Sequence, residues 1–142
     1  NSYLHIMKIL VMGLPGSGKT YLSQKLHPLL EAAWYNADRV RSMANDWDFS
    51  REGRIRQANR MKTFANFERD NKRFVVCDFV CPTKETRLAF DPDILIWMDT
   101  ITEGRYEDTN ELFEKPEKVD FHIKEWNEQN HIQIAKEVLK NV

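Results

Sequence analysis

One eight-residue segment restricts the possible folds of this chain more than any other feature. Gly13 to Thr20 reads GLPGSGKT and matches the pattern G-x-x-x-x-G-K-[ST] in full. A short apolar run, Ile6 to Met12, leads into it. Leucines at helical spacing follow it: Leu22, Leu26, Leu29 and Leu30. The sequence therefore predicts a buried strand, a glycine-rich loop and an amphipathic helix in direct succession.

A loop of this kind binds phosphate groups through its backbone. The glycines let its N–H groups turn inward, and the following helix adds unpaired donors and the positive end of its dipole. We expect Lys19 to reach the β- and γ-phosphates of ATP and the Thr20 hydroxyl to ligate Mg²⁺. A chance glycine-rich turn would not stand in register between a strand and a helix. The predicted ATP-binding residues are Gly13, Leu14, Pro15, Gly16, Ser17, Gly18, Lys19 and Thr20.

The rest of the chain alternates short apolar runs with segments of helical period, as α/β domains do. Strands are expected at Ala33 to Asn36, Phe74 to Val80 and Ile94 to Met98, with a weaker one at Val119 to Ile123. Unbroken apolar runs suit parallel strands that are covered on both faces. The predicted fold class is α/β, with a P-loop NTPase-type parallel sheet of about five strands flanked by helices.

Helix boundaries follow from proline and from capping residues. Pro28 lacks an amide donor, so the first helix should kink or end near it. A long helix is expected over Ser50 to Asp70, with its first residue as the N-cap. Asn127 or Asn130 should cap a final helix that ends near Lys140.

Composition disfavours several classes of function. Lys and Arg total 21 against 22 Asp and Glu, and the net charge of -1 argues against a general affinity for nucleic acid or acidic membrane. No apolar run approaches the roughly 20 residues of a membrane span, and the run before the glycine-rich loop is too short for a secretory signal. Cys77 and Cys81 indicate reduced packing thiols and a cytoplasmic protein. We expect one domain over residues 1–142, with residues 1–6 as a processing remnant before a natural start at Met7.

Three further segments resemble the adenylylsulfate (APS) kinases. Residues 36–60, NADRVRSMANDWDFSREGRIRQANR, are similar to the family's DGDNVR, a loop ending in GFS, and an arginine-rich helix. Residues 74–87, FVVCDFVCPTKETR, resemble its third strand ending in FISPY, and residues 113–123, FEKPEKVDFHI, resemble its YEPPENPE segment. The likeness implies transfer of the γ-phosphate of ATP to the 3′-hydroxyl of APS in sulfate assimilation, and by analogy a homodimer.

The resemblance also assigns roles to single residues. Asp38 matches the second aspartate of DGDNVR, and with Lys19 it is the predicted catalytic pair, because a carboxylate there can orient or deprotonate the acceptor hydroxyl. The alternative for Asp38 is a helix N-cap. Arg41 and Arg54 match arginines that hold the substrate's phosphosulfate, to which guanidinium forks bind well. Phe49 matches the ring that stacks on the acceptor's adenine.

Other positions of the predicted acceptor site carry less specific signals. Gln57 stands where the family has Asn, and Val80 and Cys81 stand where its Ile-Ser lines the pocket through backbone. Arg60 also corresponds to a family arginine. Asp78 ends an apolar run and has the character of a Walker-B carboxylate that holds Mg²⁺ through water. The predicted metal-binding residues are Thr20, Asp38 and Asp78.

Four departures from the family's pattern leave the acceptor open. Ala37 replaces Gly, Arg39 replaces Asn, and Asp78 stands where the family has Ser. The lid after the segment MDTI is short and acidic, with Arg105 as its only basic residue. A lid excludes water and completes the charge around the substrates, so a short one can change the acceptor. The alternatives are another nucleotide, a nucleoside or a polynucleotide hydroxyl as acceptor, or a nucleotide-binding module without catalysis.

Overall fold

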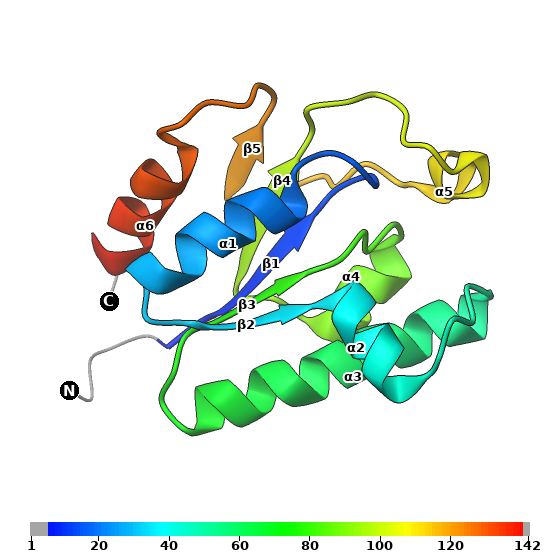
Figure 1. Ribbon diagram of the computed structural model, residues 1–142, viewed down its shortest axis with the longest axis horizontal. Helices are drawn as coiled ribbons and strands as arrows, with labels where there is room; N and C mark the ends of the chain where they lie inside the picture. The colour runs from blue at the N-terminus through cyan, green and yellow to red at the C-terminus, as the bar shows by residue number, and fades with distance from the viewer. Residues whose placement is uncertain (1–5, 141–142) are drawn as a thin grey trace.

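A five-stranded parallel sheet forms the centre of the protein (Figure 1). The computed structural model describes residues 6–140 of the 142-residue chain. Within them the strand order is β2-β3-β1-β4-β5, which confirms the predicted α/β class and the weak fifth strand. The strands are β1 (Lys8–Met12), β2 (Ala33–Asn36), β3 (Val75–Asp78), β4 (Ile94–Met98) and β5 (Phe121–Ile123).

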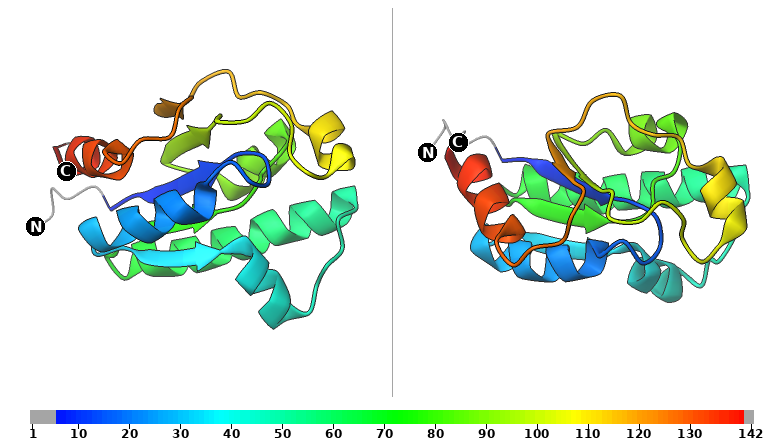
Figure 2. Two further views of the ribbon diagram at one scale, coloured as in Figure 1. Left: turned by 45° about the horizontal axis from the view of Figure 1, so that its top comes forward. Right: turned by 90° about the horizontal axis from the view of Figure 1, so that it is seen from above.

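Helices cover both faces of the sheet (Figure 2). The helices α1 (Lys19–Leu29) and α6 (Asn130–Lys140) pack on one face, and α2 (Ala37–Ala44), α3 (Arg51–Asp70) and α4 (Lys84–Phe90) pack on the other. Side chains of β1 alternate between the two resulting cores, as the twofold period of a strand requires. Ile9 and Val11 belong to the first core, and Leu10 and Met12 to the second. A strand buried on both faces explains why no polar residue interrupts its last four positions.

Several predicted helix ends are confirmed. The helix α1 ends one residue after Pro28. The Ser50 hydroxyl caps α3 by accepting a hydrogen bond from the Gly53 amide at 3.1 Å. The final helix has Asn130 as its first residue and ends at Lys140, the predicted end, while its cap stays a prediction. The start of the long helix could therefore be located from capping chemistry.

One capping interpretation is wrong. Asn36, not Asp38, caps α2, since its side-chain oxygen accepts from the Arg39 amide at 3.0 Å. Asp38 lies inside the first turn, where its carboxylate is free for other contacts. The helices α2, α4 and α5 (Glu107–Leu112) were not predicted as separate elements, because each is short and gives a weak periodic signal. The helix α4 begins at a capping box in which Thr83 and Thr86 bond to each other's backbone amides.

The topology brings the predicted site together at one edge of the sheet. The carboxyl ends of β1, β2 and β3 lie side by side, and β1 stands between β3 and β4 (Figure 1). Parallel α/β sheets bind ligands at this edge, where the connections from a central strand leave in opposite directions. Within residues 6–140, no helix has the length and apolar character to cross a membrane. Both cysteines are free and buried, and burial raises the pKa of Cys81 to about 12.

Candidate active site

A cavity of about 670 Å³ opens at the carboxyl edge of the sheet. The phosphate-binding loop forms one wall, α2 and the start of α3 form another, and the segment before and within α5 closes the top. Twelve predicted site residues line this cavity: Pro15, Gly16, Lys19, Thr20, Asp38, Arg41, Phe49, Arg54, Gln57, Asp78, Val80 and Cys81. Residues that are far apart in the chain therefore face one space, although their individual roles stay predictions.

The phosphate-binding loop is shaped by backbone geometry. Gly13 has a φ of 154°, and a Cβ at this position would lie 2.5 Å from the Met98 carbonyl oxygen. Gly18, which precedes α1, has a left-handed φ of 100°. The Thr100 hydroxyl donates to the Ser17 carbonyl at 2.7 Å and fastens the loop to the end of β4. Only glycine fits the first position, since any side chain would meet the neighbouring strand.

Lys19 is a buried amine with a carbonyl partner in its own loop. Its Nζ atom donates to the Leu14 carbonyl within the same loop at 3.0 Å. Burial lowers the pKa of Lys19 to about 8, while the carboxylates of Asp78 and Asp38 act in the opposite direction. A buried amine with one carbonyl partner gains from a phosphate group, because the anion favours its charged form.

Asp78 is held at the end of β3 by two side chains from β2. The Trp34 indole N–H donates to one carboxylate oxygen at 2.6 Å, and the Asn36 amide donates to the other at 3.0 Å. The same Asn36 amide lies 3.3 Å from the Thr20 hydroxyl. Burial raises the pKa of Asp78, and the Trp34 hydrogen bond and the charge of Lys19 oppose this rise.

These groups fit a bound Mg²⁺ ion. The buried Asp78 carboxylate and the Thr20 hydroxyl both accept from the side-chain amide of Asn36, so the two oxygens lie near each other. Oxygen ligands of this kind suit a hard divalent cation. Asp38 adds a second carboxylate to the same cavity. Among residues 6–140 there is no group of three or more His, Cys, Asp or Glu side chains arranged to hold a metal. The coordination would therefore rely on phosphate and water oxygens, as Mg²⁺ sites in phosphate-binding proteins commonly do.

The guanidinium groups of Arg41 and Arg54 both lie close to the Phe49 ring. The Arg41 guanidinium lies 4.3 Å from the centre of the Phe49 ring, and that of Arg54 lies 5.5 Å from it. The Arg54 Nε atom also donates to the Phe49 carbonyl at 2.9 Å. Burial lowers the pKa of both arginines, so the two cations are partly desolvated in a cavity that also contains Asp38. Such a pocket would favour an anionic group with an adjacent flat ring.

Two predicted acceptor residues contribute less directly than expected. Gln57 uses both ends of its amide: Nε2 donates to the Ala37 carbonyl at 3.1 Å, and Oε1 accepts from Arg60 at 2.7 Å. Cys81 has a positive φ of 48°, and its thiol donates to the Thr86 hydroxyl at 3.6 Å. Gln57 therefore joins α3 to α2, and the Cys81 thiol bonds to a residue of α4.

Several residues of the site were not predicted from the sequence. Trp34 supports Asp78 from outside the cavity lining, and the unpredicted lining residues include Asn36, Trp47, Tyr106, Asp108 and Thr109. Asn36 and Asp78 are register partners in neighbouring parallel strands, so pairing β2 with β3 would have located Asn36. The position of the lid, the segment after Ile101, depends on contacts with residues elsewhere in the chain, so the sequence did not indicate which of its residues face the cavity. Gly104 packs on Pro15, and the Asn110 side chain bonds to both the amide and the carbonyl of Gly104, at 2.7 and 3.0 Å.

The fold and this cavity define a P-loop kinase. A family model described as adenylylsulphate kinase matches residues 5–115. The chain therefore belongs to the adenylylsulphate kinase family, and the resemblance of its motifs is confirmed at this level.

Similar proteins agree with that placement. A probable adenylyl-sulfate kinase of Aeropyrum pernix is 37% identical over 84 residues, covering 53% of this chain and 44% of the relative. The match thus spans less than half of that protein's length. The fold is similar to the APS kinase CysC of Mycobacterium tuberculosis in complex with AMPPNP and APS, with a TM-score of 0.72, 19% identity, and coverage of 94% and 95% of the two chains. A sugar kinase from a Janibacter species has a TM-score of 0.70 at 14% identity, covering 97% and 96%.

Proposed function

We propose that this chain is an ATP-dependent kinase that phosphorylates the 3′-hydroxyl of APS, giving 3′-phospho-APS and ADP. The observation that carries the proposal is that Asp38 lines the same cavity as Lys19 and the Arg41–Arg54 pair, and that its charge acts on both Lys19 and Arg41. A phosphate donor at the glycine-rich loop and an anionic acceptor at the arginines would meet beside this carboxylate. Membership of the adenylylsulphate kinase family supports the same assignment.

The residues divide the reaction between them. The acceptor hydroxyl oxygen bonds to the γ-phosphorus, and the bond from that phosphorus to the β–γ bridging oxygen breaks as ADP leaves. Asp38 orients the hydroxyl and accepts its proton. Lys19 donates hydrogen bonds to the phosphate oxygens as negative charge develops on them. Thr20, Asp78 and Asp38 would hold Mg²⁺, which when bound neutralises charge on the phosphates.

The acceptor side supplies orientation. Arg41 and Arg54 would bind the phosphosulfate group by charge-assisted hydrogen bonds, and Phe49 would contact the adenine. Backbone of Val80 and Cys81 would form the opposite wall. On this proposal the enzyme acts in sulfate assimilation and in the cytoplasm, where ATP is available.

A second acceptor class is the specific alternative. The lid brings Asp108 into the cavity, and Asp108 is one of the charges that act on Arg54. An acidic group facing the arginines reduces the positive charge available to a sulfated acceptor. An uncharged nucleoside or sugar hydroxyl would be disfavoured less, and the similar fold of a sugar kinase is compatible with such an acceptor.

The test is ADP release from Mg·ATP with a panel of acceptors that includes APS, adenosine and AMP. We expect APS to stimulate turnover of the wild-type chain, and Asp38→Ala to abolish that stimulation while nucleotide binding persists. Stimulation by a nucleoside but not by APS would establish the second acceptor class. Tight ATP binding without turnover on any acceptor would show a nucleotide-binding module instead.

A further inference from the structure

The loop of residues 45–49 supports the predicted acceptor pocket without regular secondary structure. It joins α2 to α3, and we call it the recognition loop. Its carbonyls at Asp46 and Asp48 accept hydrogen bonds from Arg41 Nη1 at 2.9 and 3.1 Å. Its last residue provides the ring beneath the Arg41 guanidinium. The direction of this arginine therefore depends on the shape of an exposed loop.

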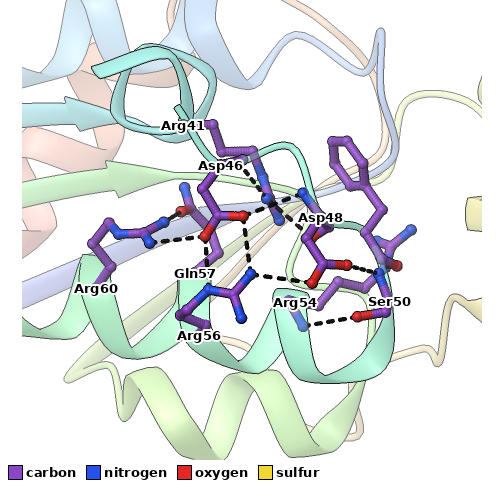
Figure 3. Close-up of polar contacts among 10 residues, drawn as sticks. Arg41, Asp46, Asp48, Ser50, Arg54, Arg56, Gln57 and Arg60 are labelled. Carbon is purple, nitrogen blue, oxygen red and sulfur yellow. Dashed lines mark hydrogen bonds and ion pairs between the residues drawn. The ribbon is translucent and has the colours of Figure 1, made fainter. Parts of the chain in front are cut away.

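Asp46 fixes that shape by ion pairs to α3 (Figure 3). Its carboxylate accepts from Arg56 Nε at 2.7 Å, from Arg56 Nη2 at 2.9 Å and from Arg60 Nη2 at 2.8 Å. It also accepts from the Asp48 amide within the loop, at 3.2 Å. Arg56 and Arg60 are four residues apart and so project from the same face of α3. Hydrogen bonds from Arg56, the larger contribution, and from Arg60 hold the pKa of Asp46 well below its ordinary range.

Two further contacts attach the loop to the start of α3. The Asp48 carboxylate accepts from the Ser50 amide at 2.9 Å and from Arg56 Nη2 at 3.1 Å. Gly53 lies directly against the loop, since a Cβ there would be 2.2 Å from the Asp48 carbonyl oxygen. This is the same carbonyl that accepts from Arg41. Glycine in the first turn of a helix costs stability relative to alanine, and here it allows the close approach of the loop.

We propose that Asp46 is a positioning residue for the acceptor's anionic group. With Arg56 and Arg60 it holds the two carbonyls that aim Arg41 and the ring that supports it. Neither Arg56 nor Arg60 lines the cavity. Arg56 bonds to Asp46 and Asp48, so it acts on the site through the loop, whereas Arg60 also donates to the cavity residue Gln57. The identity of the acceptor as APS rests on the proposed function, whereas the role of Asp46 in fixing the loop does not.

The first test is the kinetic effect of Asp46→Asn, which keeps the size of the side chain and removes its charge. We expect the KM for APS to rise about tenfold, a loss of about 1.4 kcal/mol in acceptor binding. The kcat value and the KM for ATP should stay within about twofold. Glu85→Gln is the matched control, because it removes the exposed Arg51–Glu85 ion pair from α3 without touching the loop. A fall in kcat together with a rise in the KM values for both APS and ATP would overturn the proposal by showing a general structural role.

A double-mutant cycle tests whether Asp46 acts through its arginine partner, and tryptophan fluorescence tests whether it fixes the loop. Arg56→Gln alone should raise the KM for APS in the same direction, and adding it to Asp46→Asn should have a smaller effect than in the wild-type chain, because Arg56 bonds to the loop. Trp47 lies in the loop, so Asp46→Asn should increase acrylamide quenching of its fluorescence. Repeating the comparison in a Trp47→Phe background isolates that signal from the other tryptophans.

The two proposals fail in different ways. A folded wild-type chain that neither binds nor phosphorylates APS overturns the proposed function, and the quenching experiment still decides whether Asp46 fixes the loop. Unchanged quenching and an unchanged KM for APS in Asp46→Asn overturn the positioning role alone. If Asp46→Asn does not fold, Arg56→Gln supplies both measurements, because it removes one of the same ion pairs.

Discussion

The two loops that face the cavity are built in different ways. The phosphate-binding loop, Gly13 to Thr20, is shaped by backbone: glycine conformations, one carbonyl that accepts from Lys19 and one that accepts from Thr100. The recognition loop is shaped by side chains, with Asp46 and Asp48 paired to arginines of α3. Backbone geometry needs a short contiguous motif, whereas ion pairs can join residues that are far apart in the chain.

The difference extends to packing. A Cβ at Gly13 would meet backbone of β4, so substitutions in the first loop act through steric strain. Trp47 and Phe49 in the second loop are each 52% exposed, which leaves room for substitutions that alter charge or contact without strain. Changes near the phosphates should therefore abolish function or folding, while changes in the recognition loop should alter acceptor affinity.

Lys19→Met should give the largest effect and would sharpen the contrast between the two loops. The variant removes the cation that we propose contacts the transferred phosphate, so kcat should fall by about 10²–10³-fold or more. Steady-state ADP release measures the fall. Lys136→Met, on the exposed side of α6, is the control and should leave kcat unchanged. A fall of less than about tenfold would show that the phosphates do not rely on this amine.

Gly13→Ala tests whether the first loop is set by close packing. The added Cβ would lie 2.5 Å from the Met98 carbonyl oxygen and 2.6 Å from the Ser17 hydroxyl. We expect the free energy of unfolding to fall by about 2–4 kcal/mol, measured by urea denaturation.

Gly16→Ala is the matched control for that experiment. It has a φ of 90°, but its nearest neighbour would be a side-chain carbon of Ile101 at 3.8 Å. It should cost only backbone strain, about 1–2 kcal/mol. Equal losses in the two variants would contradict the packing argument.

Arg54→Lys should produce a more moderate effect, confined to the acceptor. The Nε atom of Arg54 donates to the Phe49 carbonyl, which leaves the rest of the guanidinium for an anion. Lysine cannot make both interactions, so the KM for APS should rise about tenfold at constant KM for ATP. Arg51→Lys, three residues earlier on the same helix, should change neither. A rise in the KM for ATP instead would place Arg54 on the nucleotide side and break the division between the loops.

The smallest expected effect is a pH dependence of nucleotide affinity. On the proposed function the nucleotide's phosphate binds the protonated Lys19, whose pKa burial lowers to about 8 in the unliganded chain. Above pH 8, binding must take up a proton, and affinity should fall by up to about tenfold per pH unit. Calorimetry in two buffers of different ionisation enthalpy should detect proton uptake at pH 9 and little at pH 7. Lys19→Met should lose the difference, and equal proton uptake at both values would contradict it.

The same shift predicts the sign of a stability change. Between pH 8 and pH 10.5 the unfolded chain keeps the Lys19 proton and the folded chain does not. The contribution of Lys19 to the free energy of unfolding therefore rises with pH through this window. Below pH 8 both states hold the proton, and burial of the charge costs stability.

Much of the fold could be predicted because its signals are local. The apolar run of β1 and the glycine-rich loop stand in one segment, and the Ser50 cap located the start of α3. The N-terminal residue of α2 could not be placed in the same way. Asn36 and Asp38 are both good caps, and the choice depends on where β2 ends beside β3.

In the candidate site, too, residues within a local motif could be predicted and contacts between distant residues could not. Asp38, Arg41, Phe49 and Arg54 were identified because they match a family's spacing, and the structure places them around one cavity. The supporting contacts could not be identified. Trp34 reaches Asp78 across 44 positions of sequence, and no periodicity or motif indicates such a pair.

The sequence by itself determined the phosphate-binding loop, the α/β class and the residue types of the predicted acceptor pocket. Each depends on neighbours in the chain: glycine conformation, hydrophobic period or motif spacing. Only the tertiary structure decided which groups hold these residues in place. The ion pairs of Asp46 with Arg56 and Arg60, and the hydrogen bonds of Asp78 with Trp34 and Asn36, exist because separate elements pack together. Side-chain contacts between elements form only after the sheet and helices have assembled, so spacing along the chain cannot encode them in a local pattern.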